Sequence, residues 1–229
     1  MNKDRFVLYV GNKNYSSWSM RPWLCLKWAG IDFEERVIAL DQPGYGESRI
    51  AEVLAVSPTG KVPALHAGDL VLWDSLAIAE WANEYAPDAG LWPANPRSRA
   101  LARAAACEMH SGFAALRTAL PMNIRRRCTA RDLPAAATAD IARIDALWSR
   151  MREQYAADGP WLFGTRSITD AFFTPVATRF RTYAVALSPA ALAYRDTLLG
   201  DGAFREWEAA ALRETTDMRR MSTIDSLYA

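Results

Sequence analysis

The sequence has few cysteines and histidines, and their positions match no metal-binding or disulfide pattern. Its 229 residues contain three cysteines, Cys25, Cys107 and Cys128, with no CxxC pair, and two histidines, His66 and His110. Structural metal sites use several Cys or His ligands at short spacings, so no metal site is expected. A sparse, odd set of cysteines is also typical of a reducing compartment rather than of a disulfide framework.

The chain also lacks a long hydrophobic run and an excess of charge of one sign. Its first apolar run, residues 6–10, is too short for a signal-peptide core or a membrane span. The 27 Lys and Arg residues nearly balance the 26 Asp and Glu residues, which gives a formal net charge of +1. Nucleic-acid binding needs a concentrated positive excess. We therefore expect a cytoplasmic protein with neither nucleic acid nor a membrane as its partner.

The first 85 residues mix strand and helix patterns. Short apolar runs predict strands at 6–10, 33–40, 62–66 and 70–73, with a hairpin turn at 67–69 between the last two. Helical patterns occur around 23–28, more weakly up to Leu54, and from Leu76 onward. The predicted order of elements is therefore βαβαββα over residues 1–85.

Beyond residue 85 the composition and the hydrophobic pattern of the sequence change. Prolines and a glycine are concentrated in residues 86–97, which is the composition of a linker. From there on strand patterns are nearly absent, and apolar residues recur at helical spacing near 101–116, 141–155, 173–187 and 204–211. The sequence thus predicts an all-helical unit over residues 98–229. Within it, Ser167 and Asp170 predict a capping box at the start of a buried helix.

A hydroxyl-rich loop, residues 15–21, follows the first predicted strand and leads into a helix. Amide groups at a helix start point outward and carry partial positive charge, so they favour an anion such as a thiolate. A serine hydroxyl that donates to a thiolate lowers the pKa of the thiol from its usual value of about 8.5. Taken alone, however, these serines are explained more simply as helix caps.

Two more segments have properties of a binding site. Val62-Pro63 begins a strand, and a cis bond there turns the Val62 N–H and C=O outward, where an extended peptide can pair with them. Asp74-Ser75 begins a helix, where amides and a hydroxyl suit a carboxylate and Asp74 suits an ammonium group. A trans proline and a simple N-cap are the alternatives for each segment alone.

Three stretches together resemble the soluble (cytosolic) glutathione transferase family in order and spacing. They are Ser16-Ser17-Trp18-Ser19-Met20-Arg21, Ser57-Pro58-Thr59-Gly60-Lys61-Val62-Pro63-Ala64-Leu65 and Trp73-Asp74-Ser75-Leu76-Ala77-Ile78. The serine pattern looks most like the zeta class and related bacterial proteins. The resemblance implies an N-terminal thioredoxin-like α/β domain that binds glutathione, a C-terminal helical bundle, and a homodimer.

The resemblance also implies which residue activates the thiol. Ser16 would donate a hydrogen bond to the sulfur of glutathione, with Ser17 as the alternative donor. Where many zeta-class proteins carry a cysteine after the serine pair, this chain has Trp18. That difference argues against the isomerase reaction typical of the zeta class, because an indole changes the shape of the site.

The remaining roles implied by the resemblance concern binding of glutathione as the cosubstrate. Val62 would pair through its backbone with the cysteinyl part, beside a cis Pro63. Asp74 and Ser75 would hold the γ-glutamyl end. Lys61 would reach the glycine carboxylate, unless its side chain is simply solvated.

The second substrate is expected between the two domains. Residues 120–125 are the candidate wall of its pocket, where Met122 suits varied apolar electrophiles and Arg125 suits an acidic group. A surface helix end is the alternative for this segment. The resemblance implies a glutathione S-transferase acting on a small electrophile, as in detoxification. A glutathione-dependent cis-trans isomerase of a maleylacetoacetate-type diacid and a non-catalytic binding module are the alternatives.

Overall fold

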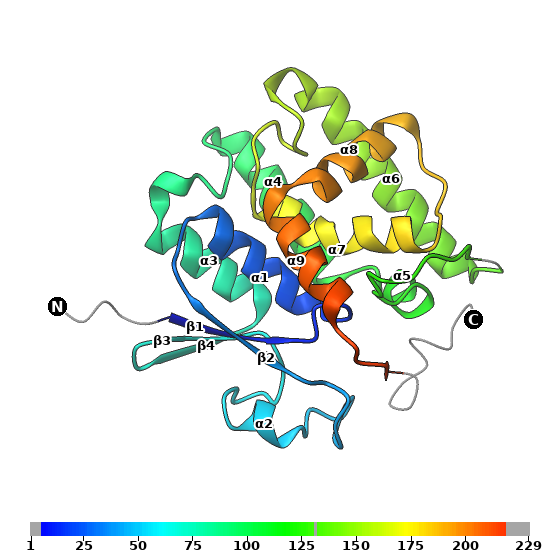
Figure 1. Ribbon diagram of the computed structural model, residues 1–229. Helices are drawn as coiled ribbons and strands as arrows, with labels where there is room; N and C mark the ends of the chain where they lie inside the picture. Colours follow the sequence, from blue (N-terminus) through cyan, green and yellow to red (C-terminus); the bar gives the residue numbers. More distant parts are fainter. Residues whose placement is uncertain (1–5, 131, 219–229) are drawn as a thin grey trace.

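A computed structural model describes residues 6–130 and 132–218, and shows a small sheet packed against a group of helices (Figure 1). The polar segment 1–4 and the last part of the predicted helical unit, residues 219–229, lie outside the described residues. The N-terminal part comprises β1 (Phe6–Gly11), α1 (Ser17–Trp28), β2 (Glu34–Ile38), α2 (Ala51–Leu54), β3 (Ala64–Ala67), β4 (Leu70–Trp73) and α3 (Ser75–Tyr85). The predicted βαβαββα order is confirmed.

The four strands form one mixed sheet in the order β2-β1-β3-β4. β1 pairs in parallel with β2 and antiparallel with β3, and β3 pairs antiparallel with β4. Side chains alternate along β1, so Leu8 and Val10 join the main core, whereas Tyr9 packs with Val53 of α2. Helices therefore cover both faces of the sheet, with α1 and α3 on one face and α2 on the other (Figure 1).

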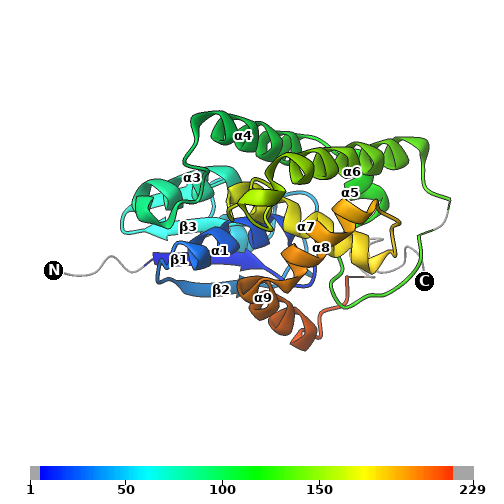
Figure 2. The same cartoon turned by 90° about the horizontal axis from the view of Figure 1, so that it is seen from above.

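After Tyr85 the named elements of the described chain are all helical. They are η1 (Pro87–Ala89), α4 (Pro96–Ser111), α5 (Ala114–Ala119), α6 (Ala135–Tyr155), η2 (Ala156–Asp158), α7 (Ile168–Thr182), α8 (Pro189–Gly200) and α9 (Gly202–Arg213). Helix α7 lies in the middle of the group, with α4 and α6 on one side and α1 and α8 on the other (Figure 2). Almost every side chain of α7 is buried, as expected for a helix surrounded by others.

Two predicted helices are wrong in their extent. The helical pattern over 101–116 is broken at Gly112 and Phe113, and Phe113 has a left-handed φ of 56° before α5 begins. The pattern over 173–187 ends at Thr182, and the separate helix α8 was not predicted. In both places, the two successive segments bury apolar residues in the same core. The helical spacing of apolar residues therefore continues through the bend, and the sequence pattern does not show where one helix ends.

The predicted capping box at the start of α7 is confirmed, and its carboxylate does more than cap the helix. Oδ2 of Asp170 accepts from the backbone N–H of Ser167 at 2.8 Å. Oδ1 accepts from the N–H of Leu162 at 3.0 Å and from the hydroxyl of Tyr194 on α8 at 2.7 Å. Burial raises the pKa of Asp170, while these hydrogen bonds lower it. One carboxylate thus joins α7, the preceding loop and α8.

Candidate functional site

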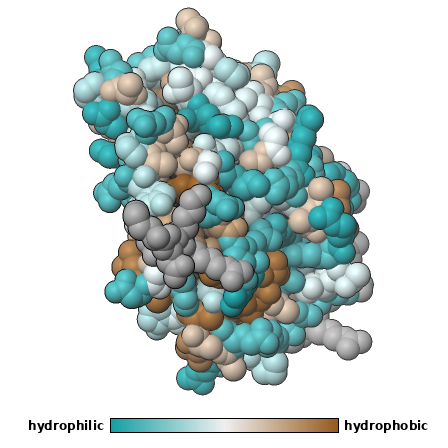
Figure 3. Space-filling view, turned by 60° about the vertical axis from the view of Figure 1, so that its left-hand side comes forward, coloured by the Kyte–Doolittle hydropathy of each residue, from teal (hydrophilic) through white to brown (hydrophobic). Residues whose placement is uncertain are grey.

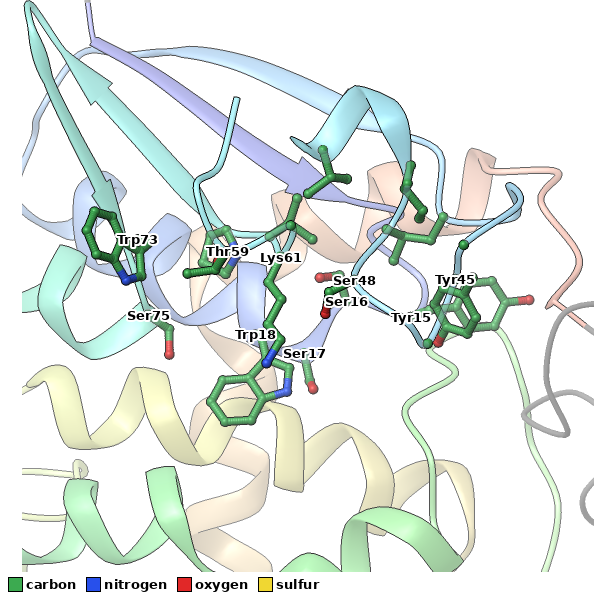
Figure 4. A pocket seen from close by; sticks show the side chains of 18 of the residues that line it. Tyr15, Ser16, Ser17, Trp18, Tyr45, Ser48, Thr59, Lys61, Trp73 and Ser75 are labelled. Carbon is green, nitrogen blue, oxygen red and sulfur yellow. The ribbon is translucent and has the colours of Figure 1, made fainter. Parts of the chain in front are cut away.

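A cavity of about 630 Å³ lies where the β1–α1 loop, the residues around α2 and the start of α3 meet (Figure 4). Its lining brings together most of the residues that the sequence predicts for the site. These are Ser16, Ser17, Lys61, Val62, Pro63, Asp74 and Ser75. They come from three segments far apart in the chain, so the fold assembles what the sequence could only suggest.

Ser16 stands at the N-cap position of α1 but does not cap the helix. Its side chain makes no capping hydrogen bond. Instead, its hydroxyl donates to the Oγ of Ser19 at 2.7 Å, and the same Ser19 oxygen accepts from the backbone N–H of Gly11 at 3.1 Å. The simpler explanation of Ser16 as a helix cap therefore does not describe this structure.

Ser17 is the first residue of α1 and is tied to the helical part of the molecule. Its Oγ accepts from Nη2 of Arg179 at 3.3 Å. Arg179 lies on α7, is only 4% exposed, and also donates to the carbonyl oxygens of Leu120 and Pro175. Burial and the nearby Arg117 lower the pKa of Arg179 to about 10, so the guanidinium is still charged at neutral pH. A positive charge thus lies directly behind Ser17.

At the start of α3, a carboxylate oxygen of Asp74 caps the helix, whereas the hydroxyl of Ser75 has no hydrogen-bond partner among the described residues. Oδ1 of Asp74 accepts from the N–H of Leu76 at 2.7 Å, so Asp74 is the N-cap that the sequence allowed. The Oγ of Ser75 is buried and has no hydrogen-bond partner among the described residues, although Ser75 lines the cavity. A buried, unpaired hydroxyl is costly, so a ligand group that reaches it gains a ready partner. The Val62–Pro63 peptide bond is cis, as predicted.

The other carboxylate oxygen of Asp74 faces a histidine from the helical part. Oδ2 of Asp74 lies 3.3 Å from Nε2 of His110 near the end of α4. Burial lowers the pKa of His110, Asp74 raises it, and Arg21 and Arg117 lower it further. The net lowering keeps His110 neutral at pH 7, so it approaches Asp74 as a hydrogen-bonding partner rather than as a cation.

A group of arginines surrounds Trp18, whose side chain is 37% exposed and lines the cavity. The guanidinium of Arg21 lies 4.2 Å from the Trp18 ring and 4.9 Å from the Phe172 ring, and that of Arg117 lies 5.3 Å from Trp18. Arg21 is fully buried, and its guanidinium nitrogens have no hydrogen-bond partner among the described residues. Burial, Arg179 and Arg117 lower the pKa of Arg21 to about 9. Two positive charges therefore lie beside Trp18, with the carboxylates of Asp74 and Asp140 near enough to offset part of them.

Most of the basic residues around the cavity were not predicted from the sequence. Arg21 entered only as part of a motif, whereas Arg117, Arg179 and His110 come from helices whose mutual packing the sequence does not reveal. One signal was available, since Arg179 interrupts the buried apolar pattern of Phe173, Val176 and Phe180 on α7. A charged residue on the buried side of a helix indicates a functional or bridging role.

Met122 and Arg125 are placed differently from the predicted pocket wall, because neither is among the lining residues. Met122 is 2% exposed and belongs to the core. The guanidinium of Arg125 donates to the Tyr15 hydroxyl at 3.1 Å and to the backbone carbonyls of Glu214 and Thr216. Residues 120–125 instead contact the β1–α1 loop. Their apolar and basic side chains therefore support that loop and do not line the cavity.

The part of the chain that the structure describes also bears on metal binding, membrane spanning and thiol reactivity. Residues 6–130 and 132–218 contain no group of His, Cys, Asp and Glu side chains able to hold a metal ion. Over the same ranges, no helix combines the length and the hydropathy needed to cross a bilayer. Cys25 is buried within α1, and burial raises the pKa of its thiol, which keeps it in the unreactive form.

The part of the chain that lines the cavity matches a known family model. Residues 15–84 match the model described as the glutathione S-transferase N-terminal domain. A maleylpyruvate isomerase from Ralstonia sp is 31% identical over 197 residues, which cover 77% of this chain and 86% of that protein. A probable maleylacetoacetate isomerase from Caenorhabditis elegans is 33% identical over 113 residues, or 49% of this chain, and the match spans about half (50%) of that relative's length.

Solved structures with the same arrangement extend over nearly the whole chain. The holo structure of a maleyl pyruvate isomerase, a bacterial glutathione S-transferase of the zeta class, is 25% identical with a TM-score of 0.69, covering 92% of this chain and 100% of its own. A glutathione transferase homologue from Burkholderia with bound glutathione is 25% identical with a TM-score of 0.67, covering 90% and 97%.

Proposed function

Because the chain belongs to the glutathione S-transferase family and is similar to its zeta class, we propose that it ionises the thiol of glutathione in this cavity for attack on a small electrophile. The observation that carries the proposal is the meeting of Ser16, Val62, Asp74 and Ser75 in one cavity. Each supplies a different contact that a γ-glutamyl tripeptide needs. A thiolate is the strong nucleophile, and the protein supplies its position and a favourable potential.

Binding of glutathione follows from the groups that line the cavity. The backbone of Val62 pairs with the cysteinyl unit as an added strand would. The unpaired Ser75 hydroxyl and the N-terminus of α3 hold the γ-glutamyl carboxylate, and Asp74 attracts its ammonium group. Lys61 lines the same cavity and attracts the carboxylate of the glycine end (Figure 4).

We assign the donor role to Ser16 rather than Ser17 because the Ser17 oxygen is held by Arg179 of the helical part, whereas the Ser16 hydroxyl is hydrogen-bonded, among the described residues, only to the neighbouring Ser19. The Ser16 hydroxyl donates to Ser19, whose oxygen keeps the Gly11 amide as a partner after Ser16 turns away. Redirecting that proton to the sulfur exchanges one hydrogen bond for a stronger, charge-assisted one. The Ser17 oxygen accepts from Arg179, which holds that side chain against α7 but leaves its own proton available, so Ser17 stays the alternative donor.

The first measurement is the ultraviolet titration of glutathione bound to the wild-type protein. We expect thiolate absorbance at neutral pH, because the start of α1, Ser16 and the nearby cations all favour the anion. The same titration of free glutathione, whose thiol ionises near pH 8.5, is the control. Binding without thiolate, or no binding at all, contradicts a catalytic role and leaves the non-catalytic module as the better account.

A second candidate reaction is the cis-trans isomerisation of a maleylacetoacetate-type diacid. The arginine group beside Trp18 favours it, because Arg21 and Arg117 place two positive charges against a side chain that lines the cavity. In this reaction the thiolate adds to the conjugated double bond, the resulting single bond rotates, and elimination releases the thiolate unchanged. Trp18 stands where many zeta-class proteins have a cysteine. The indole does not remove the positive charge that this reaction needs, but it changes the shape of the site.

Replacing Arg117 by methionine tests whether the second substrate is acidic. We expect kcat/KM for a maleyl-type diacid to fall about tenfold or more, because a charge-assisted hydrogen bond to a carboxylate contributes about 1.5–3 kcal/mol. Activity with a neutral electrophile is expected to change less than about threefold. Arg150→Met, an exposed change on α6, is the matched control. Equal losses with both substrates would argue that Arg117 only supports the fold.

We further propose a cytoplasmic homodimer, with residues 1–85 as the glutathione-binding domain, 86–97 as a linker and 98–229 as the helical domain. Apolar and aromatic side chains are exposed around the edge strand β4, where Leu70 is 44% and Trp73 47% exposed, and Tyr85 of α3 is 57% exposed. Figure 3 brings the side with the β3–β4 hairpin forward and shows hydrophobic residues gathered on its lower half. Covering such a surface in a dimer removes it from water.

A further inference from the structure

The loop that carries Ser16 is held from outside by a segment near the other end of the chain. We define the serine loop as residues 12–16 and the C-terminal segment as residues 214–216, directly after α9. The carboxylate of Glu214 accepts from two successive amides of the loop, through Oε1 from Lys13 at 2.5 Å and through Oε2 from Asn14 at 3.0 Å. One side chain therefore fixes the direction of two peptide groups just before Ser16.

Thr216 adds two contacts to the same loop. Its Oγ1 accepts from Nδ2 of Asn12 at 2.9 Å, and its carbonyl oxygen accepts from the hydroxyl of Tyr15 at 3.2 Å. Tyr15 lines the cavity and precedes Ser16 in sequence. Contacts from the C-terminal segment thus reach every residue of the loop from Asn12 to Tyr15.

Arg125 joins the loop to the C-terminal segment. Its Nη2 donates to the Tyr15 hydroxyl at 3.1 Å and to the Thr216 carbonyl at 2.5 Å, and its Nη1 donates to the Glu214 carbonyl. Its own backbone N–H donates to Oδ1 of Asn14 at 2.9 Å. Because the guanidinium is planar and rigid, it sets the spacing between these partners more strictly than a lysine would.

We infer that Glu214 and Arg125 are positioning residues for the Ser16 hydroxyl. The inference rests on the proposed thiolate-forming role of Ser16. Asn12, Lys13, Asn14 and Tyr15 are all buried, so the loop has little freedom once its partners are in place. A hydroxyl misplaced by 1 Å makes a poor hydrogen bond to the sulfur. Loosening the loop should therefore raise the pKa of the bound thiol while leaving the groups that bind the rest of glutathione unchanged.

The test compares Glu214→Gln with Glu206→Gln, an exposed glutamate on α9 that pairs with Lys27. Glutamine offers one acceptor in place of two and turns an N–H₂ group toward an amide donor. We expect the pKa of glutathione bound to Glu214→Gln to rise by about one unit, a tenfold loss of thiolate below that pKa. Affinity for S-methylglutathione, which has no thiol to ionise, should change less than about twofold, and Glu206→Gln should match wild type in both.

A milder variant keeps the test decisive if Glu214→Gln does not fold. Thr216→Val removes only the acceptor for Asn12 and should shift the thiol pKa in the same direction by a smaller amount. An unchanged thiol pKa in folded variants overturns the inference, as does an equal loss of affinity for S-methylglutathione. Absence of thiolate in the wild type is a different result, because it would contradict the proposed function itself.

Discussion

Replacing Ser16 by alanine is expected to lower kcat/KM for glutathione conjugation by about 100-fold or more. Removing one preorganised donor to a developing or bound anion costs about 10²–10³ in rate in comparable sites. Ser16 makes no capping hydrogen bond, so its loss should leave the start of α1 intact. Thiolate absorbance at neutral pH should disappear, whereas affinity for S-methylglutathione should stay within about twofold of wild type.

Ser17→Ala is the matched control for this experiment, since it removes a hydroxyl one residue away. Its oxygen accepts from Arg179, so we expect a partial loss of thiolate through the displaced guanidinium, smaller than that of Ser16→Ala. If Ser17→Ala alone abolishes the thiolate, the donor role belongs to Ser17. If neither variant changes it, the thiolate is stabilised by the helix start and the cations, and the serine mechanism is wrong.

Replacing Asp170 by asparagine is expected to have the largest effect on folding, lowering the free energy of unfolding by about 3 kcal/mol. The asparagine N–H₂ would face donors that now share a carboxylate, and a buried donor left without an acceptor costs about 1–3 kcal/mol. The donors are the N–H groups of Leu162 and Ser167 and the hydroxyls of Ser167 and Tyr194. Urea unfolding followed by circular dichroism measures the loss.

Tyr194→Phe is the control because it removes only one of these donors and keeps the buried ring. We expect about 1 kcal/mol of destabilisation from that change. A loss in Asp170→Asn no greater than in Tyr194→Phe would contradict a shared role for the carboxylate. Glutathione binding should persist in folded Asp170→Asn, since Asp170 is not among the residues that line the cavity.

The parts of the fold that sequence predicted well depend on local patterns. Short apolar runs, a hairpin turn and a helix cap at Asp74 each involve residues within a few positions of one another. The break between α4 and α5 was missed because it depends on the left-handed conformation of Phe113, which no residue type at that position announces. Helix α8 was missed because its buried residues extend a pattern already assigned to α7.

In the candidate site, too, the residues of short local motifs were predicted and those brought together by helix packing were not. The residues lining the cavity from the N-terminal part belong to short motifs, so their order and spacing already suggested glutathione. The cations beside Trp18 come from α1 and α5, and the cation behind Ser17 comes from α7; their approach depends on how helices pack, which spacing does not specify. Arg125 shows the same limit, because a cation in an apolar segment is as consistent with a substrate contact as with support of a loop.

The hydrogen bond between Lys13 and Glu214 joins residues 201 positions apart, and this has a consequence for how the protein matures. On the ribosome, β1 and the serine loop emerge first, and the carboxylate that holds the loop is added only after nearly all of the helices have been made. The sheet can pair early, but the loop before Ser16 acquires its last partners near the end of translation. A nascent or prematurely terminated chain would thus contain the serines without the geometry that makes them useful.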